Sequence, residues 1–325
     1  MNDDRAAAPQ NSLPSKIRAV RVHEFGGISA MNEEEIDCPV PTAGQVLVKV
    51  AAAGVGPWDG WIRSGNSVLP QPLPLTLGSD LAGTVVQLGP DVTAFAVGDE
   101  IFGVTNPRFT NAYAQYALAD ANMISKKPGI LSFVEAASVP VVASTAWQML
   151  FDRGGAVTGT TVLVLGGAGN VGAYAVQFAA QAGARVLASA LPDKVEYVKR
   201  LGAVVVIEST AAGLPEPIEQ VDLVVDAVGG QSLPDSFNWV KSGGRIVSAV
   251  SVPDREIAKQ KNVDAFFHLV RVNSPGLEKI AEMIGGGKIA TRVGDVLELK
   301  NARLAHEMLE GKRHKPGKIV LTIPH

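Results

Sequence analysis

A glycine-rich turn between an apolar run and an alanine-rich segment constrains this chain more than any other feature. Residues 161–165, "TVLVL", are followed by Gly167-Ala168-Gly169-Asn170-Val171-Gly172 and then by residues with helical spacing. This G-x-G-x-x-G pattern is informative because it follows an expected strand and opens an expected helix. The first glycine allows a tight turn, the second lets backbone N–H groups approach a diphosphate, and the third lets helix and strand pack closely. The sequence therefore predicts a dinucleotide-binding loop; the alternative is a turn without a ligand.

The region around this loop alternates between short apolar runs and helical segments. After the loop we expect a helix over 171–182 and a second over 193–202, and the further strands are expected at 185–189, 203–207, 221–228, 244–250 and 265–272. A third helix is expected over 233–243. Strands that are apolar almost throughout are typical of a parallel sheet covered on both faces. Residues 133–287 are therefore predicted to form a doubly wound α/β domain of the Rossmann type.

The two flanking regions have a different pattern. Residues 16–132 are mostly short alternating or apolar runs bounded by glycine and proline, which indicates a β-rich domain. Residues 288–325 predict a short strand, one amphipathic helix and a last strand, which are not stable alone. We therefore expect the C-terminal segment to return to the first domain. Residues 1–15 are expected to be a flexible tail.

Charge and composition exclude several classes of function. A net charge of −3 gives no broad attraction to nucleic acid or to an anionic membrane. The single cysteine, Cys38, excludes an internal disulfide and a cysteine-rich metal site. The N-terminus lacks a signal-peptide pattern, and no apolar run reaches the ~18–20 residues that span a bilayer. We therefore expect a cytoplasmic protein with a small-molecule substrate and without nucleic-acid or membrane partners.

The end of the second expected strand indicates which dinucleotide binds. NAD-binding chains usually place Asp or Glu there, but this strand ends with Ser189 and Ala190, and Lys194 follows. A hydroxyl and an ammonium would bind a 2′-phosphate, with a charge-assisted contact contributing ~1.5–3 kcal/mol. We therefore predict NADPH rather than NADH. The alternative for Lys194 is a solvated helix lysine, and Asp193 is interpreted as a helix-start residue.

From about residue 16 to residue 322 the chain resembles the medium-chain dehydrogenase/reductase superfamily. Within it, the chain is most similar to the zinc-independent quinone oxidoreductases, the zeta-crystallin-like group. Besides the glycine loop, the resemblance depends on "AAGVGPWDGWIRSG", "PLTLGSDLAGTVVQLGPDVTAFAVGDEIFG", "ASTAWQML", "VDLVVDAVGG", "GGRIVSAVS" and "GKIVL". It implies a GroES-like β-rich domain (16–132 and 288–325), a Rossmann domain (133–287), a site in the cleft between them, and a homodimer made by pairing sheet edges.

The resemblance also implies individual cofactor contacts. Gly169, Asn170 and Val171 would hold the pyrophosphate, and Gly167 and Gly172 belong to the same loop. The 2′-phosphate and adenosine end would be contacted by Ser189, Lys194 and Ser209. The contacts implied after the later strands and along the nicotinamide are Gly229, Gly230, Val250, Ser251, Phe267, His268 and Leu269.

The same resemblance marks the substrate side. Thr145 matches a threonine near the nicotinamide carboxamide, and Trp61 stands where relatives place a tyrosine beside the substrate. The chain departs from the pattern at Gly56, where relatives commonly carry an asparagine near the nicotinamide ring. Trp61, Asp59 and Thr145 are our candidate catalytic residues. Asp59 also fits a role in local backbone hydrogen bonds, and Trp61 one in ordinary packing.

Metal-dependent chemistry is not expected. Zinc alcohol dehydrogenases of the superfamily carry Cys and His ligands, where this chain has "GPWD" and Gly78-Ser79-Asp80. The five histidines show no ligand spacing. Without a metal, oxidising an unactivated alcohol is difficult, whereas hydride transfer from a reduced nicotinamide to an electron-poor π system is easier.

The sequence therefore predicts NADPH-dependent reduction of a quinone or an α,β-unsaturated carbonyl compound. An enoyl-thioester reductase is an alternative within enzymes, since it shares the hydride step. A hypothesis of another class is an NADPH-binding protein with a sensing, structural or RNA-binding role and little turnover. No basic patch supports RNA binding, and the most basic stretch, "GKRHKPGK", is interpreted as a solvated loop.

Overall fold

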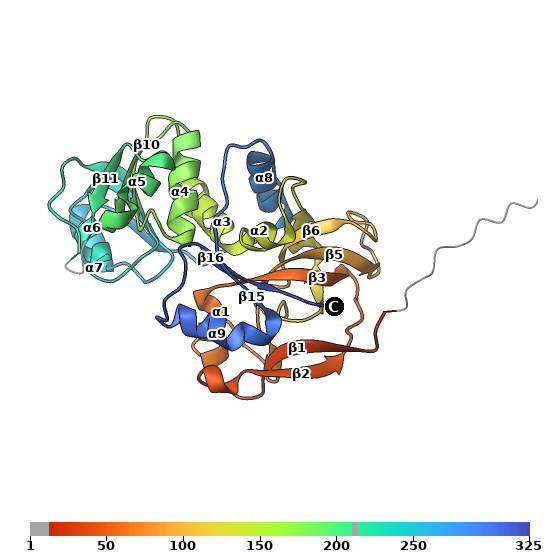
Figure 1. Cartoon of the computed structure of the whole chain (residues 1–325). Helices are drawn as coiled ribbons and strands as arrows, with labels where there is room; N and C mark the ends of the chain where they lie inside the picture. Colours follow the sequence, from red (N-terminus) through yellow and green to blue (C-terminus); the bar gives the residue numbers. More distant parts are fainter. Residues whose placement is uncertain (1–12, 210–212) are drawn as a thin grey trace, which may run out of the picture.

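The computed structural model describes residues 13–209 and 213–325, and these residues form three β-sheets with helices around them (Figure 1). Most of the expected tail, residues 1–15, lies outside the described residues. The boundaries expected for the two domains remain a prediction. Within the described residues, no helix has the length and apolarity that crossing a bilayer requires.

A six-stranded parallel sheet carries the glycine loop, which confirms the predicted α/β fold class. Its strand order is β11-β10-β9-β12-β13-β14, and each neighbouring pair is parallel. The strands span Thr161–Leu165 (β9), Arg185–Ala190 (β10), Val205–Glu208 (β11), Val221–Asp226 (β12), Val240–Ser248 (β13) and Asp264–Phe267 (β14). The order reverses beside β9, and such a switch point leaves a crevice at the carboxyl ends of the strands.

Helices accompany this sheet, and their ends follow local sequence signals. α2 begins with a capping box in which Ser132 and Glu135 hydrogen-bond reciprocally, and α3 has proline at its first turn. The helices are α2 (Phe133–Ala137), α3 (Pro140–Trp147, continued by a π-helical turn, Gln148–Arg153), α4 (Asn170–Gln181), α5 (Val195–Arg200, preceded by a 3-10 turn, Pro192–Lys194), α6 (Ser232–Ser236), α7 (Arg255–Lys261) and α8 (Ser274–Gly285).

Two expected elements end earlier than their patterns suggested. The helix expected over 233–243 stops at Ser236, because the backbone N–H of Val221 donates to the Trp239 carbonyl at 2.7 Å and draws this segment into the sheet. The strand expected over 265–272 ends at Phe267. The following residues leave the sheet and line a cavity instead.

The remaining strands form a seven-stranded sheet, in the order β15-β16-β3-β5-β6-β8 with β7 paired to β3, and a three-stranded sheet, β2-β1-β4. Their bounds are β1 Lys16–Val22, β2 Asn32–Asp37, β3 Gln45–Val55, β4 Leu75–Thr76, β5 Asp80–Leu88, β6 Glu100–Val104, β7 Tyr116–Asp120, β8 Ile124–Lys126, β15 Val293–Glu298 and β16 Lys318–Thr322. β16 pairs antiparallel with β3, so the C-terminal segment returns to the N-terminal sheet.

Short helices complete the β-rich half. α1 (Pro57–Ser64) and α9 (Ala302–Leu309) contact each other, and 3-10 turns span Ile28–Ala30, Ala121–Met123 and Leu299–Asn301. Figure 1 shows α2 and α3 between the parallel sheet and the β-rich half. Fully buried residues of these helices, such as Ala137 and Ala143, belong to one hydrophobic core that also includes residues of β3 and β9. The packing that joins the two halves also forms the floor of the site.

Candidate active site

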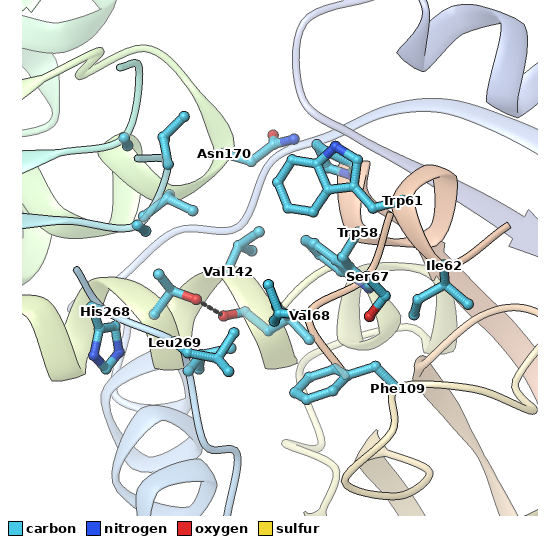
Figure 2. A pocket seen from close by; sticks show the side chains of 18 of the residues that line it. Trp58, Trp61, Ile62, Ser67, Val68, Phe109, Val142, Asn170, His268 and Leu269 are labelled. Atoms are coloured by element: carbon cyan, nitrogen blue, oxygen red, sulfur yellow. Dashed lines mark hydrogen bonds between the residues drawn. The ribbon is translucent and has the colours of Figure 1, made fainter. Parts of the chain in front are cut away.

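A cavity of about 330 Å³ lies between the β-rich half and the carboxyl ends of the parallel strands (Figure 2). Most of its wall is apolar. It is lined by α1 and the loop after it, by α3, by the glycine loop and by the segment that follows β14. The predicted residues that line it are Trp61, Thr145, Gly169, Asn170, Val171, Gly172, Val250, Phe267, His268 and Leu269.

The glycine loop packs tightly against α4 at Gly172 and leaves more room at Gly169. A Cβ on Gly172 would lie 2.0 Å from the Gly166 carbonyl oxygen, so only glycine fits where helix and loop pack. Gly169 differs, because its φ of −75° and ψ of 172° suit any residue and an added Cβ would meet only Gly166, at 3.3 Å. The missing side chain at Gly169 therefore keeps room for a ligand at the N-terminus of α4, where free N–H groups favour an anion.

Ser189 is the residue before the last in strand β10, Lys194 is in the 3-10 turn that follows the strand, and Ser209 directly follows β11; none of the three lines the 330 Å³ cavity. The backbone N–H of Ser209 donates to the Ala190 carbonyl at 2.9 Å. The Ser189 hydroxyl is buried and accepts a hydrogen bond from the Gly166 N–H at 3.0 Å, so this serine also holds the start of the glycine loop. The Lys194 ammonium is paired with the neighbouring carboxylate of Asp193.

A buried pair that sequence reasoning missed shapes the turns after β12 and β13. Asp226, the last residue of β12, accepts hydrogen bonds from the Gly229 N–H at 2.8 Å and from the Ser248 hydroxyl at 2.6 Å. The Ser248 oxygen in turn accepts from the N–H groups of Val250 and Ser251, each at 3.2 Å. Of the predicted residues here, Val250 reaches the cavity, whereas Gly229, Gly230 and Ser251 form the turns behind it. An aspartate at the end of an apolar strand was the available signal.

The segment after β14 and helix α3 form another wall. The His268 Nε2 lies 3.1 Å from the Gln148 side-chain oxygen. Burial, with a smaller effect of the Arg153 charge, lowers the His268 pKa to about 4, so the ring is neutral at pH 7. The Thr145 hydroxyl donates to the Val141 carbonyl at 2.7 Å. Thr145 therefore reaches the cavity with its hydroxyl proton already engaged.

The substrate side is apolar and aromatic. Trp61 is 50% exposed at the cavity, and Trp58, Val68 and Phe109 line the same side (Figure 2). Ser67, which sequence reasoning also missed, accepts a hydrogen bond from the Leu69 N–H at 3.1 Å. In the part of the chain that the structure describes, the Ser67 hydroxyl donates to no partner, so its proton is available to a bound molecule.

Asp59 does not line the cavity, although it was a catalytic candidate. Its side chain is fully buried, and one carboxyl oxygen accepts hydrogen bonds from the Gly56 N–H at 2.8 Å and the Tyr113 hydroxyl at 3.1 Å. Burial raises the Asp59 pKa to about 7. These contacts correspond to the structural alternative, in which Asp59 holds the start of α1 and thereby positions Trp58 and Trp61.

Comparison with known proteins agrees with this geometry. Residues 42–183 match the family described as alcohol dehydrogenase GroES-like domain, and residues 201–321 match the family described as zinc-binding dehydrogenase. The chain is 30% identical over 324 residues to a quinone oxidoreductase of Lama guanicoe, covering 94% of this chain and 98% of that protein. The chain belongs to the zeta-crystallin-like quinone oxidoreductase group of the medium-chain dehydrogenase/reductase superfamily.

Two further relatives support this membership, which confirms the resemblance found in the sequence. A chloroplastic NADPH-dependent alkenal/one oxidoreductase of Arabidopsis thaliana is 30% identical over 325 residues, covering 95% of this chain and 80% of that protein. The solved structure of the quinone oxidoreductase from Coxiella burnetii superposes with a TM-score of 0.84 and 32% identity, covering 95% of this chain and all of that one. As a member of this superfamily, the chain is an oxidoreductase with a nicotinamide cofactor.

The zinc implied by one family description does not fit the side chains at this medium-chain reductase site. Within residues 13–209 and 213–325, no three His, Cys, Asp or Glu side chains are grouped as metal ligands. Asp80 stands where zinc alcohol dehydrogenases of the superfamily carry their ligand motif, and its carboxylate is instead buried 3.0 Å from the ammonium of Lys318. No catalytic step is therefore derived through a metal.

Lys318 is a further residue at the site that sequence reasoning missed. It is the first residue of β16 and lines the cavity, with its ammonium 4.1 Å from the centre of the Trp58 ring. A lysine opening a buried strand in "GKIVL" was the sequence signal. Burial raises the pKa of its partner Asp80, although the Lys318 charge opposes that shift.

Proposed function

We propose that this protein is a zinc-independent, NADPH-dependent oxidoreductase that reduces a quinone or an α,β-unsaturated carbonyl compound. The observation that supports this most directly is the shared cavity. It places the N-terminus of α4, at Gly169 and Asn170, in the same space as Trp61 and the segment Phe267–Leu269. A dinucleotide and a flat acceptor would therefore meet in a site shielded by apolar side chains.

The preference for NADPH is supported by the tip of β10. No carboxylate ends that strand, and Lys194 follows four residues after its last residue, Ala190. The pairing of Lys194 with Asp193 is on the surface, and such pairs are weak, so a 2′-phosphate would compete for the ammonium. The name of the Arabidopsis relative, NADPH-dependent alkenal/one oxidoreductase, agrees with this preference.

The chain's own residues would orient the acceptor and stabilise charge. When bound, the reduced nicotinamide supplies a hydride to the electron-poor carbon of the acceptor. Negative charge then develops on the acceptor's carbonyl oxygen, and a hydrogen-bond donor lowers its energy, more strongly in an apolar cavity. Ser67 is our candidate donor, because its oxygen accepts from Leu69 and its hydroxyl donates to no partner within residues 13–209 and 213–325. Thr145 donates to Val141 and would serve for positioning.

The cavity lining favours a neutral, apolar acceptor over an enoyl thioester. Among the described residues that line the cavity, Lys318 is the one lysine or arginine, and Asp80 already neutralises it. The phosphates of a coenzyme A carrier would therefore find no free cation in the lining. Trp58, Trp61 and Phe109 offer faces on which a planar quinone or enone can stack.

The test is NADPH oxidation with a panel of acceptors. We expect turnover with benzoquinone-type and enone acceptors, weaker turnover with crotonyl-CoA, and none with simple alcohols and NADP⁺. Prior dialysis against EDTA should leave the rate unchanged. If NADPH binds but no acceptor is reduced, the proposal fails and the alternative of a sensing or structural NADPH-binding protein is favoured.

We also propose a homodimer that functions in the cytoplasm. The strand β14 pairs with β13 on one side and forms an outer edge of the parallel sheet, as the order of the described strands shows. An open edge of this kind can pair with a second copy. Sedimentation equilibrium would test the dimer, and fractionation of the source cells would test the location.

A further inference from the structure

A second, small cavity adjoins the main one at the glycine loop. Its volume is about 10 Å³, and it shares Val142, Gly169, Asn170 and Lys318 with the main cavity. Its other side is formed by one face of α4, by α5 and by the segment that enters β15. The residues from these elements are Ala173, Tyr174, Gln177, Tyr197, Ala290 and Arg292.

Three polar groups at this small cavity are buried without a hydrogen-bond partner among the described residues. One is the Lys318 ammonium, which forms the ion pair with Asp80. The other two are the Nη1 of Arg292 and the hydroxyl of Tyr174, a residue that is only 5% exposed. A buried donor left unpaired is costly, and nearly all such groups in proteins have a partner. A guanidinium donor and a hydroxyl beside the N-terminus of the twelve-residue helix α4 are suited to an anion.

The Arg292 side chain is held in place from two directions. Ala290 and the side chain of Gln177 on α4 exchange hydrogen bonds of 2.8 and 3.2 Å, which fixes the segment against the helix. The guanidinium carbon of Arg292 lies 4.0 Å from the centre of the Tyr197 ring. Cation–π stacking of this kind orients a guanidinium without using its hydrogen-bond donors.

Arg292 and the neighbouring Lys318 differ in whether their positive charges are paired with a carboxylate. The backbone N–H of Lys318 donates to the Arg292 carbonyl at 3.0 Å, so the two cations start adjacent strands. Lys318 is paired with Asp80. Arg292 forms no ion pair within the part of the chain that the structure describes. Its positive charge is therefore available to a ligand at the glycine loop.

We propose that Arg292 binds the diphosphate of the dinucleotide, together with the backbone N–H groups at the start of α4. This inference depends on the proposed function, since it takes the ligand to be a nicotinamide dinucleotide. We assign the diphosphate rather than the 2′-phosphate because the small cavity is lined by Ala168, Gly169 and Asn170, and not by Ser189 or Lys194. Arg292 comes from the β-rich half and α4 from the parallel-sheet half, so the bound diphosphate joins the two.

Equilibrium binding tests this role without measuring turnover. Dissociation constants for NADPH and for NADH would be measured by calorimetry on the wild type, Arg292→Gln, Arg292→Lys and Arg200→Gln. Arg200 is the matched control, because it is exposed on the same helix as Tyr197 and lies outside both cavities. We expect Arg292→Gln to weaken both dinucleotides by at least about tenfold and by the same factor. Arg292→Lys should recover part of the affinity, and the control should change it less than about twofold.

Three results would overturn the inference. A loss confined to NADPH would place Arg292 at the 2′-phosphate instead of the diphosphate. Unchanged dissociation constants, with a lower melting temperature of the cofactor-free protein, would make Arg292 a purely structural residue. The third result is failure of the wild type to bind either dinucleotide, which would remove the proposed function together with this inference. Each of the first two results would remove this inference alone.

Discussion

The ammonium of Lys318 lies 3.0 Å from the carboxylate of Asp80, and both side chains are closed off from solvent, at 2% and 0% exposed. The pair joins the first residues of β16 and β5. The other Asp80 oxygen accepts a hydrogen bond from the Val141 N–H of α3 at 3.0 Å. One carboxylate thus connects the C-terminal strand, the N-terminal sheet and the helix beneath the cavity.

Removing one partner of this pair should be strongly destabilising. Lys318→Met leaves the Asp80 charge buried and uncompensated, and losses of about 3–5 kcal/mol are typical of such changes. Asp80→Asn combined with Lys318→Met should recover part of the loss, because no lone charge remains. Urea unfolding would measure the free energies. The exposed pair Lys199–Glu196 is the control, and Lys199→Met should cost less than about 1 kcal/mol. Equal losses for the two lysine variants would refute the argument.

Two buried groups should give opposite pH dependences of stability. Burial raises the Asp59 pKa from 3.8 to about 7, so the folded protein keeps a proton that the unfolded chain releases. Stability from this group therefore falls as the pH rises from about 4 to about 7. Burial, aided by the Arg63 charge, lowers the His306 pKa from 6.5 to about 3. The unfolded chain then binds the extra proton, so stability from His306 falls as the pH drops below about 6.5.

Asp59→Asn should separate these two effects. The variant loses the contribution that favours low pH, so between about pH 4.5 and 6.5 its stability should rise with pH more steeply than that of the wild type. The difference in slope is at most about 1.4 kcal/mol per pH unit, the value for one proton. Unfolding in urea at closely spaced pH values measures it. His306→Gln should change the slope in the opposite direction, and parallel curves for Asp59→Asn and the wild type would contradict the prediction.

Gly169 and Gly172 should respond differently to the same substitution. Gly172→Ala forces a Cβ to 2.0 Å from a backbone oxygen, so it should lower the melting temperature. Gly169→Ala meets one atom, at 3.3 Å, and should leave the fold nearly as stable. Because its new methyl group occupies the phosphate cradle, NADPH affinity should fall about tenfold or more. Thermal melting with and without NADPH distinguishes the two, and undiminished NADPH binding by Gly169→Ala would argue against a ligand at this loop.

Lys194→Glu should reverse the cofactor preference. Exchanging an ammonium for a carboxylate removes a charge-assisted contact and adds repulsion, so the NADPH dissociation constant should rise about 10- to 100-fold while that of NADH changes little. Lys199→Glu makes the same charge change on α5 and is the control. Steady-state rates with both cofactors provide the readout. Equal use of NADPH and NADH by the wild type would refute the assignment from the start.

Trp61→Ala should affect the acceptor rather than the fold. Trp61 is half exposed, so its removal should change the melting temperature little. The loss of a stacking face should raise the KM of naphthoquinone by about 2- to 10-fold, with a smaller effect on benzoquinone. Trp61→Tyr should retain most of the affinity. A variant with unaltered KM for both quinones would show that Trp61 does not contact the acceptor.

Much of the parallel-sheet half could be predicted because its signals are local. The β-branched runs, the alanine-rich helix α4 and the spacing of Gly167, Gly169 and Gly172 report backbone geometry within a few residues. The same reasoning predicted elements that were too long where pairing between residues distant in sequence sets the end of the element. The helix expected over 233–243 ended at Ser236 because Trp239 pairs with Val221, and the strand expected over 265–272 ended at Phe267.

Some residues of the candidate site could be named from the sequence, and others could be found only in the structure. The residues named from the glycine pattern or from family resemblance, such as Asn170, Trp61 and His268, do line the cavity. Asp59 was named from the sequence as a catalytic candidate, but only the structure shows that it lies in the first turn of α1 with its side chain fully buried. Arg292 had no sequence signal, because its significance comes from an unpartnered nitrogen beside a loop far away in the chain.

The sequence by itself determined the Rossmann-type sheet and the position of its glycine loop, through hydrophobic periodicity and glycine spacing. It also shows directly that no carboxylate stands at the tip of β10. Tertiary structure alone decided which charged groups are buried and which partners they meet: Lys318 with Asp80, the Arg63 guanidinium donating to the neutral His306 ring at 2.8 Å, and the Arg292 Nη1 without a hydrogen-bond partner among the described residues. The reason is physical. Backbone conformation is set by neighbouring residues, whereas the energy of a charge depends on solvent exclusion and on partners brought together by folding.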